Sequence, residues 1–266
     1  MAFVKGSFFS EALGMNTDFT AVLPDPGVAR EKKGKLFPTL YLLHGGGENY
    51  TELPTETGLL EYVRKTFPEL IVIMPNAHFS FYTDYAEDYK YAYKYQTYIS
   101  RELPEIVRTL FPSSSARSDN FIYGCSMGGC GSLIAGLNNP GFYGVIGLQS
   151  PMCDLQWAID TRPFLTVKHR YMLGTYDVTG SKYDFYSLTE KLNASDGPKP
   201  AIWHSWAVED YLLEINQKFN AHMLRMDNME YTYSVVQRVH GWGEHSCGIE
   251  NFLNWLVVYH RRKEER

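Results

Sequence analysis

The sequence predicts an α/β fold, with a mostly parallel central sheet and helices covering both of its faces. Short apolar runs rich in β-branched and aromatic residues alternate with longer stretches whose apolar residues recur at helical spacing. Strands that alternate with helices favour parallel pairing, because each helix carries the chain back across the sheet. A third observation is a serine between glycines where an expected strand meets an expected helix.

Six short runs are expected to be strands. They lack a strict alternation of polar and apolar residues, which is typical of strands buried on both faces. Five stretches are expected to be helices, because their apolar residues fall on one helical face. The expected strands are 37–43, 70–74, 120–123, 145–148, 201–206 and 231–236, and the expected helices are 98–111, 127–137, 183–192, 211–224 and 249–260.

The composition is that of an ordinary globular domain. The chain has 266 residues, of which 44% are hydrophobic and 21% charged. No repeat or long linker divides it, so residues 1–266 are expected to form a single domain. The net charge of −5, from 25 Lys and Arg against 30 Asp and Glu, argues against nucleic acid or an anionic membrane as a partner.

The four cysteines form neither a CxxC pair nor a zinc-binding pattern, so we expect no disulfide framework and no metal. The first residues lack the apolar core of a secretory signal, and no apolar run is long enough to span a bilayer. A cytoplasmic location follows as the expectation. No phosphate-binding glycine motif is present, so no nucleotide cofactor is expected either.

Residues 124–128 read Gly-Cys-Ser-Met-Gly, with Ser126 at the centre. A strand, a sharp turn and a helix of small residues in this order are typical of a nucleophile elbow, which holds a serine in a strained conformation at the end of the sheet. The start of the helix also offers free backbone N–H groups to a developing oxyanion. Ser126 is therefore the expected nucleophile.

A second glycine-rich turn, His44-Gly45-Gly46-Gly47, follows the expected strand 37–43. Glycines let the backbone approach an acyl oxygen closely, and hydrolases with a serine elbow take an oxyanion donor from this loop. We expect the backbone N–H groups of Gly46 and Met127 to form the oxyanion hole. His44 is expected to orient the loop, since the base of this architecture follows the nucleophile in the chain.

His240 is the expected general base, because it lies in the loop between the expected strand 231–236 and the last helix. His245 lies in the same loop and is the alternative. The remaining candidates are His169, His204, His222 and His260. His204 lies inside an expected strand, and His222 and His260 lie inside expected helices, where histidines more often belong to the core or the surface.

Asp210 is the expected acid, because it follows the expected strand 201–206. The chain between Asp210 and His240 is long enough for one helix and one strand. Asp177 is an alternative, but it would demand a further helix and strand in between, and Glu209 is a third candidate. The chain order Ser, Asp, His is that of α/β-hydrolases, so the predicted fold is the α/β-hydrolase fold.

With these motifs the sequence resembles the putative-esterase family, which includes bacterial tributyrin esterases and S-formylglutathione hydrolases. The resemblance covers nearly the whole chain and implies the same triad: Ser126, Asp210 and His240. The chain departs from the family at Gly241, where Asp or Ser is usual. The matching segments are Leu-Leu-His-Gly at 42–45, Phe-Tyr-Thr-Asp at 81–84, Glu-Leu-Pro at 102–104, Gly-Cys-Ser-Met-Gly-Gly at 124–129, Glu-Asp-Tyr-Leu at 209–212 and His-Gly-Trp at 240–242.

We therefore expect a serine carboxylesterase that hydrolyses short-chain esters, acetyl to butyryl, including acetylated sugars or aromatic esters. An S-formylglutathione thioester hydrolase and an acyltransferase similar to the mycolyltransferases are the alternatives. Tyr82 and Trp242 are the expected substrate contacts. The resemblance is also compatible with a homo-oligomer.

The segment from residue 82 to 98 contains seven tyrosines. One interpretation is an amphipathic surface segment that turns its hydroxyl groups to water. The other is an aromatic wall beside the substrate cleft, because tyrosine supplies both apolar area and a polar tip. The sequence leaves both interpretations open.

Overall fold

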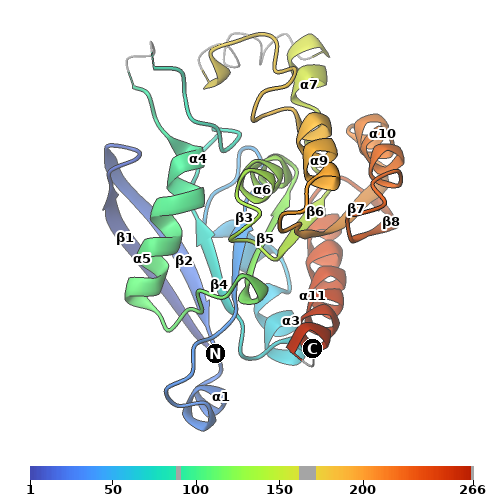
Figure 1. Ribbon diagram of the computed structural model, residues 1–266. Coiled ribbons are helices and arrows are strands. Elements are labelled where there is room, and N and C mark those ends of the chain that lie inside the picture. Colours follow the sequence, from blue (N-terminus) through green and yellow to red (C-terminus); the bar gives the residue numbers. More distant parts are fainter. Residues whose placement is uncertain (88–90, 162–171, 265–266) are drawn as a thin grey trace.

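The computed structural model describes residues 1–87, 91–161 and 172–264. An eight-stranded sheet runs through the molecule in the order β1-β2-β4-β3-β5-β6-β7-β8 (Figure 1). The strands are β1 (Ala2–Ser10), β2 (Met15–Leu23), β3 (Thr39–Leu43), β4 (Ile71–Pro75), β5 (Asn120–Cys125), β6 (Val145–Gln149), β7 (Ala201–Glu209) and β8 (Tyr231–Val239). All pairs from β4 through to β8 are parallel, which confirms the predicted α/β architecture.

The N-terminal hairpin of β1 and β2 was not predicted from the sequence. The two strands pair antiparallel with each other, and β2 pairs antiparallel with β4. The hairpin turn includes Gly14 at φ +63°, a conformation that favours glycine. Because β1 lies at the edge, its side chains alternate between exposed and partly buried, and no continuous apolar run marks it.

Helices cover both faces of the sheet (Figure 1). On one face lie α5, α6, α9 and α10, and on the other lie α3 and α11. Their bounds are α3 (Leu59–Thr66), α5 (Leu103–Leu110), α6 (Met127–Asn138), α9 (Phe185–Ala194), α10 (Leu213–Met223) and α11 (Trp242–Glu264). The shorter helices α1 (Pro26–Glu31), α2 (Glu52–Glu56), α4 (Tyr95–Thr97) and α7 (Leu155–Thr161) lie in connections.

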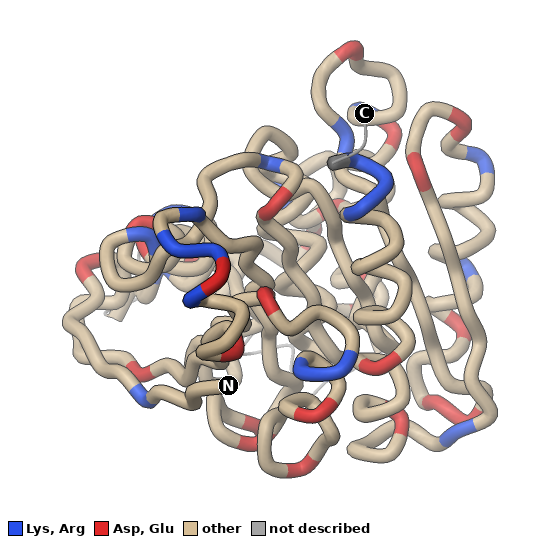
Figure 2. The backbone as a smooth tube through the Cα atoms, turned by 90° about the horizontal axis from the view of Figure 1, so that it is seen from below, with Lys and Arg blue, Asp and Glu red and all other residues tan. Residues whose placement is uncertain are grey.

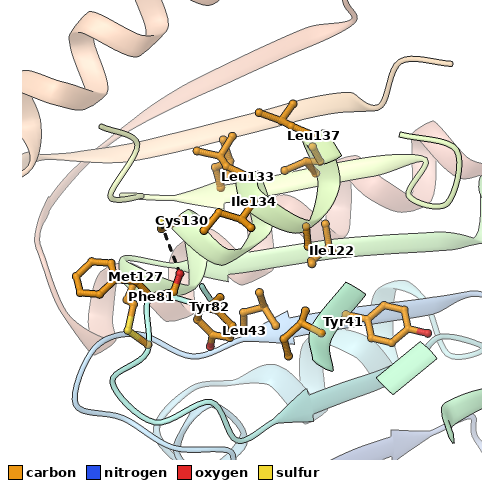
Figure 3. Close-up of a cluster of buried hydrophobic side chains, with 14 of the residues drawn as sticks. Tyr41, Leu43, Phe81, Tyr82, Ile122, Met127, Cys130, Leu133, Ile134 and Leu137 are labelled. Atoms are coloured by element: carbon orange, nitrogen blue, oxygen red, sulfur yellow. Dashed lines mark hydrogen bonds between the residues drawn. The ribbon is translucent and has the colours of Figure 1, made fainter. Parts of the chain in front are cut away.

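Neighbouring residues of the central strands belong to different cores. Tyr41 and Leu43 of β3 face the core beneath α6, whereas Leu40 and Leu42 face the core beneath α11. Side chains alternate between the two faces of a strand, so a sheet covered on both sides needs apolar residues at every position. Figure 3 shows the first core, where Leu133, Ile134 and Leu137 of α6 pack over the sheet. This packing explains the continuous apolar runs in the sequence.

The predicted helix 98–111 begins earlier and is not uniform. Helix α4 leads into a wider π-helical turn at Tyr98–Glu102, which continues as α5. Pro104 lies at the start of α5. Proline has no N–H, so it cannot donate the helical bond that would point back into the preceding turn. The proline thus marks the place where the wider turn ends.

Lys and Arg residues are interspersed with Asp and Glu on the face seen from below in Figure 2. Within the part of the chain that the structure describes, no helix is both long and apolar enough to cross a membrane.

Candidate active site

Ser126 lies between β5 and α6 with φ 53° and ψ −115°. This positive φ is strained for a residue with a side chain and is typical of a nucleophile elbow. The backbone around it is packed so closely that only glycine fits. A Cβ on Gly124 would lie 2.1 Å from the backbone of Gly128, and one on Gly128 would lie 2.2 Å from the Leu43 carbonyl oxygen. The glycines therefore make the sharp turn possible.

Replacing Gly128 with alanine is expected to destabilise the protein by at least about 2 kcal/mol, because the new methyl group meets backbone atoms that cannot move aside. Thermal unfolding measures the effect. Gly141→Ala is the matched control, since a Cβ there meets nothing within 4 Å. Equal melting temperatures for the two variants would contradict the tight packing of the elbow.

Gly46 and Met127, the expected oxyanion donors, lie side by side. A Cβ on Gly46 would be 3.8 Å from the Met127 Cβ and 2.9 Å from the ring of Phe79. Gly46 is exposed, so a substrate can reach its backbone. Met127 is the first residue of α6, where an N–H has no acceptor within the helix. The structure thus brings two backbone segments suited to hydrogen-bond an oxyanion next to Ser126.

His44 supports the loop that carries Gly46. Its Nε2 accepts a hydrogen bond of 3.0 Å from the Ala77 N–H, and its Nδ1 donates to the Gly45 carbonyl at 2.8 Å. The ring is buried, and this burial lowers its pKa to about 4, so it stays neutral at physiological pH. A neutral, doubly hydrogen-bonded imidazole holds the loop in place.

Tyr82 does not lie where an exposed substrate contact would be. Only 1% of its surface is exposed, and its hydroxyl donates a 2.9 Å hydrogen bond to the His44 carbonyl. The sequence-based expectation of a substrate contact therefore finds no support, because the Tyr82 ring is packed inside the core beneath α6 (Figure 3). The tyrosine braces the same loop as His44.

The rest of the tyrosine-rich segment is largely packed inward as well. Tyr95 and Tyr98 are buried in the same core as Tyr82, and Tyr85 and Tyr93 pack against it. Tyr91 is exposed by 54% of its surface. Tyr89 lies outside the described residues. Most of these rings therefore serve the core rather than the surface or a cleft wall.

Asp210 and His240 meet at the carboxyl edge of the sheet. Asp210 follows β7, His240 follows β8, and Asp210 Oδ2 lies 2.9 Å from His240 Nδ1. The alignment depends on a bulge: Ala207 pairs with Val236, but Glu209 pairs with Val239. Without the extra residue in β8, His240 would fall one position out of step with Asp210. The other carboxylate oxygen of Asp210 accepts a 2.8 Å hydrogen bond from the Leu212 N–H.

The two groups shift each other's pKa in opposite directions. Burial alone would raise the pKa of Asp210, but the hydrogen bond and charge of His240 bring it below the usual aspartate value. Burial alone would lower the pKa of His240, but the hydrogen bond and charge of Asp210, with smaller contributions from Glu244 and Glu48, raise the pKa above the usual histidine value. The arrangement therefore favours an ionised aspartate next to a readily protonated imidazole.

The alternative acids and bases lie elsewhere or differ in character. Asp177 and Glu209 are exposed. His245 is buried 5.4 Å from the His240 ring, and burial lowers its pKa to about 3. His204, His222 and His260 hydrogen-bond to Asn216, Thr189 and Asp119 respectively. His169 lies outside the described residues. None of the described alternatives makes the contact that joins Asp210 to His240.

Trp242 is half-buried at the start of α11, two residues after His240. Its ring meets His245 edge-on at 5.7 Å. Its exposed part keeps it available to a substrate, so its role as a substrate contact stays a prediction.

Two residues near His240 were not singled out from the sequence. The Tyr211 ring lies 4.7 Å from the His240 ring, and its hydroxyl is 3.4 Å from His240 Nε2. Glu244 is fully buried beside His240 Nδ1, at 3.8 Å. The spacing His240-x-x-x-Glu244 on a helix start was the available signal, since residues four apart face each other on a helix.

Comparisons with known proteins identify the family to which the chain is similar. The family model described as "Putative esterase" matches residues 10–246. An acetyl esterase of Caldicellulosiruptor saccharolyticus is 28% identical over 268 residues, covering 96% of this chain and 98% of that protein. The structure of FphF, a fluorophosphonate-binding serine hydrolase of Staphylococcus aureus, has a TM-score of 0.86 at 27% identity, covering 96% and 98% of the two chains. An S-formylglutathione hydrolase, FrmB, of the same organism has a TM-score of 0.82 at 27% identity and the same coverage.

The residues matched by the family model include the glycine-rich loop at 44–47, the turn at Ser126 and the Asp210–His240 pair. The acetyl esterase and the two structures extend the similarity over nearly the whole chain. The chain belongs to the putative esterase family, and it has the α/β-hydrolase fold and the carboxylesterase activity that go with this membership.

Proposed function

We propose that this protein is a serine carboxylesterase that hydrolyses short-chain acyl esters, acetyl to butyryl, through an acyl-enzyme intermediate. The observation that carries the proposal is that the strained Ser126 and the Asp210–His240 pair lie at the same edge of the sheet. In this mechanism His240 takes the proton of Ser126 as the serine oxygen attacks the ester carbonyl. Asp210 fixes the imidazole tautomer and stabilises its positive charge.

The N–H groups of Gly46 and Met127 bind the oxygen of the tetrahedral intermediate. His240 then gives its proton to the departing alcohol and activates water for the second step. No cofactor enters these steps. The substrate range is supported by the acetyl esterase relative, which is similar over 98% of its length. Acetylated sugars and aromatic esters fall within this range. A cytoplasmic location and a homo-oligomeric state stay predictions.

A series of p-nitrophenyl esters tests the acyl preference. We expect kcat/KM to be highest for chains of two to four carbons and to fall for longer ones, because no long apolar insertion is visible in the sequence to cover a long chain. Faster turnover of a decanoyl ester than of acetyl and butyryl esters would contradict the proposal.

S-formylglutathione hydrolysis is the second candidate, because FrmB is similar over nearly the whole chain. A direct assay of S-formylglutathione beside p-nitrophenyl acetate decides between them. A kcat/KM for the thioester well above that for every short-chain ester would make it the preferred substrate.

The pH profile of kcat/KM is expected to rise through a midpoint above the ordinary histidine pKa of about 6.5. His240 must be neutral to accept the Ser126 proton, and its pKa is raised by Asp210 against the opposing effect of burial. Activity is therefore lost as the pH falls below this raised value. A midpoint clearly below the ordinary value would contradict the assignment of His240 as base.

A further inference from the structure

Glu244 is a charged residue in an unusual place. It lies in the first turn of α11, and none of its side chain is exposed. Glutamates are rarely buried unless they are paired, because removing a carboxylate from water is costly. Glu244, a buried glutamate beside the proposed catalytic histidine, is therefore expected to have partners that offset this cost.

One oxygen of Glu244 is firmly held. Oε1 accepts hydrogen bonds from the side-chain amide of Gln149 and from the hydroxyl of Ser150. Gln149 ends β6, and its carbonyl also accepts the backbone N–H of Ser126. Ser150 follows at φ 40°, a strained conformation, and its hydroxyl also accepts a 3.3 Å hydrogen bond from the Ala207 N–H. The carboxylate is thus anchored on the segment that also supports the elbow.

The other oxygen faces the histidines. Oε2 lies 3.8 Å from His240 Nδ1 and 3.6 Å from His245 Nδ1. No described residue hydrogen-bonds to it. Asp210 Oδ2 approaches the same His240 nitrogen at 2.9 Å, and the three groups of Asp210, His240 and Glu244 have ligand atoms within 4.8 Å of one another. His240 Nδ1 therefore faces two carboxylates: that of Asp210, which is hydrogen-bonded to it, and that of Glu244, which is close but not bonded.

We propose that Glu244 is a second positioning residue for His240, which adds its charge to that of Asp210 and accepts the Nδ1–H when Asp210 is lost. This proposal rests on the proposed function of Ser126 and His240. The single Nδ1–H bonds to Asp210 because that oxygen is nearer. Glu244 acts on the same nitrogen through its charge, which is weakly screened in a buried site. When the imidazolium forms, both carboxylates stabilise it.

Burial raises the pKa of Glu244, while the hydrogen bonds from Ser150 and Gln149 and the charge of His240 act in the opposite direction and favour its ionised form. Glu244 is one of the groups that raise the pKa of His240, although burial opposes them. His245 remains neutral and contributes no charge. Glu48 lies beyond it, with Oε1 3.7 Å from His245 Nε2 and Oε2 bonded to the Gly45 N–H. The remaining titratable groups near Glu244 are Tyr123 and Cys125, both buried and both with raised pKa values, so they stay neutral at physiological pH.

A double-mutant cycle tests the proposal on p-nitrophenyl acetate. In the parent, Glu244→Gln is expected to lower kcat about 3- to 10-fold. In the Asp210→Asn background, the same change is expected to cause a loss of kcat at least about 10-fold larger than in the parent. The reason is that the amide can no longer accept the Nδ1–H in place of the aspartate. Equal losses in the two backgrounds would overturn the proposal, because they would show that Glu244 does not substitute for Asp210.

The pH profile supplies a readout that a purely structural role would not move. Glu244→Gln removes a negative charge near His240, so the midpoint of kcat/KM is expected to shift to lower pH. Glu209→Gln is the matched control: it removes a carboxylate one residue before Asp210, but on the exposed surface. A shift in the control as large as in Glu244→Gln, or no shift in either, would contradict the proposal.

Two further variants keep the outcome unambiguous. If Glu244→Gln melts at a much lower temperature, Glu244→Met removes the carboxylate without leaving a buried amide, and it carries the same expected results. Ser126→Ala separates the two levels of inference. If that variant keeps its activity, the proposed function fails. If it is inactive while the cycle shows no coupling, only the role of Glu244 fails.

Discussion

Replacing Ser126 with alanine is expected to lower kcat on p-nitrophenyl acetate by about 10⁶-fold, the scale known for nucleophiles of catalytic triads. The loss follows because no other side chain can form the acyl-enzyme at the elbow. A fluorophosphonate probe is expected to label the parent protein and to leave the variant unlabelled. FphF, which is described as binding such a probe, is similar over 96% of this chain.

Ser132→Ala is the matched control for this change. Ser132 is also a buried serine of α6, but it lies almost two helical turns beyond Ser126. It should therefore keep both activity and labelling. Substantial activity in Ser126→Ala, or labelling that depends on Ser132, would contradict the assignment of the nucleophile.

Replacing Asp210 with asparagine is expected to lower kcat by at least about 10²-fold, and the comparable change in a serine protease costs about 10⁴-fold. An amide next to Nδ1 favours the wrong imidazole tautomer, so Nε2 no longer accepts the serine proton. The melting temperature should change little, because the substitution preserves shape and the hydrogen bond from the Leu212 N–H. Kinetics and thermal unfolding of the same preparation measure both effects.

Asp177→Asn and Glu209→Gln are the controls, and the activity of both should remain close to that of the parent because both carboxylates are exposed. A large loss of kcat in Asp177→Asn, together with an unchanged kcat in Asp210→Asn, would show that the acid is assigned wrongly. The loss in Asp210→Asn is expected to stop short of that in Ser126→Ala, since Glu244 remains beside His240 Nδ1.

Much of the site could be predicted from the sequence because its parts are local. The elbow is encoded by glycines within two residues of Ser126, and their need for space is visible in the tight contacts of Gly124 and Gly128. Asp210 and His240 could be found because each follows a recognisable apolar run, and parallel strands bring their carboxyl ends to one edge. The buried strands could be predicted from their continuous apolar runs, because a sheet covered on both faces needs apolar side chains on both faces.

The features that escaped prediction depend on contacts between distant segments. The hairpin of β1 and β2 has no apolar run, because one strand lies at the sheet edge and gains its place through pairing with β4 by way of β2. Tyr82 looked like a substrate contact, yet its hydroxyl reaches the carbonyl of His44, 38 residues away in the chain. A tyrosine suits either place, so its sequence could not decide between them.

By itself the sequence therefore determined the alternation of strands and helices and the strained serine turn, and it predicted Ser126, Asp210 and His240 as the triad. Each of these features depends on a short stretch of chain. Only the tertiary structure decided how those stretches meet. The bulge between β7 and β8 sets Asp210 opposite His240, and the packing of α11 against β6 buries Glu244 on Gln149 and Ser150. Register and burial arise from pairing and packing across the molecule, which no local pattern of residues can specify.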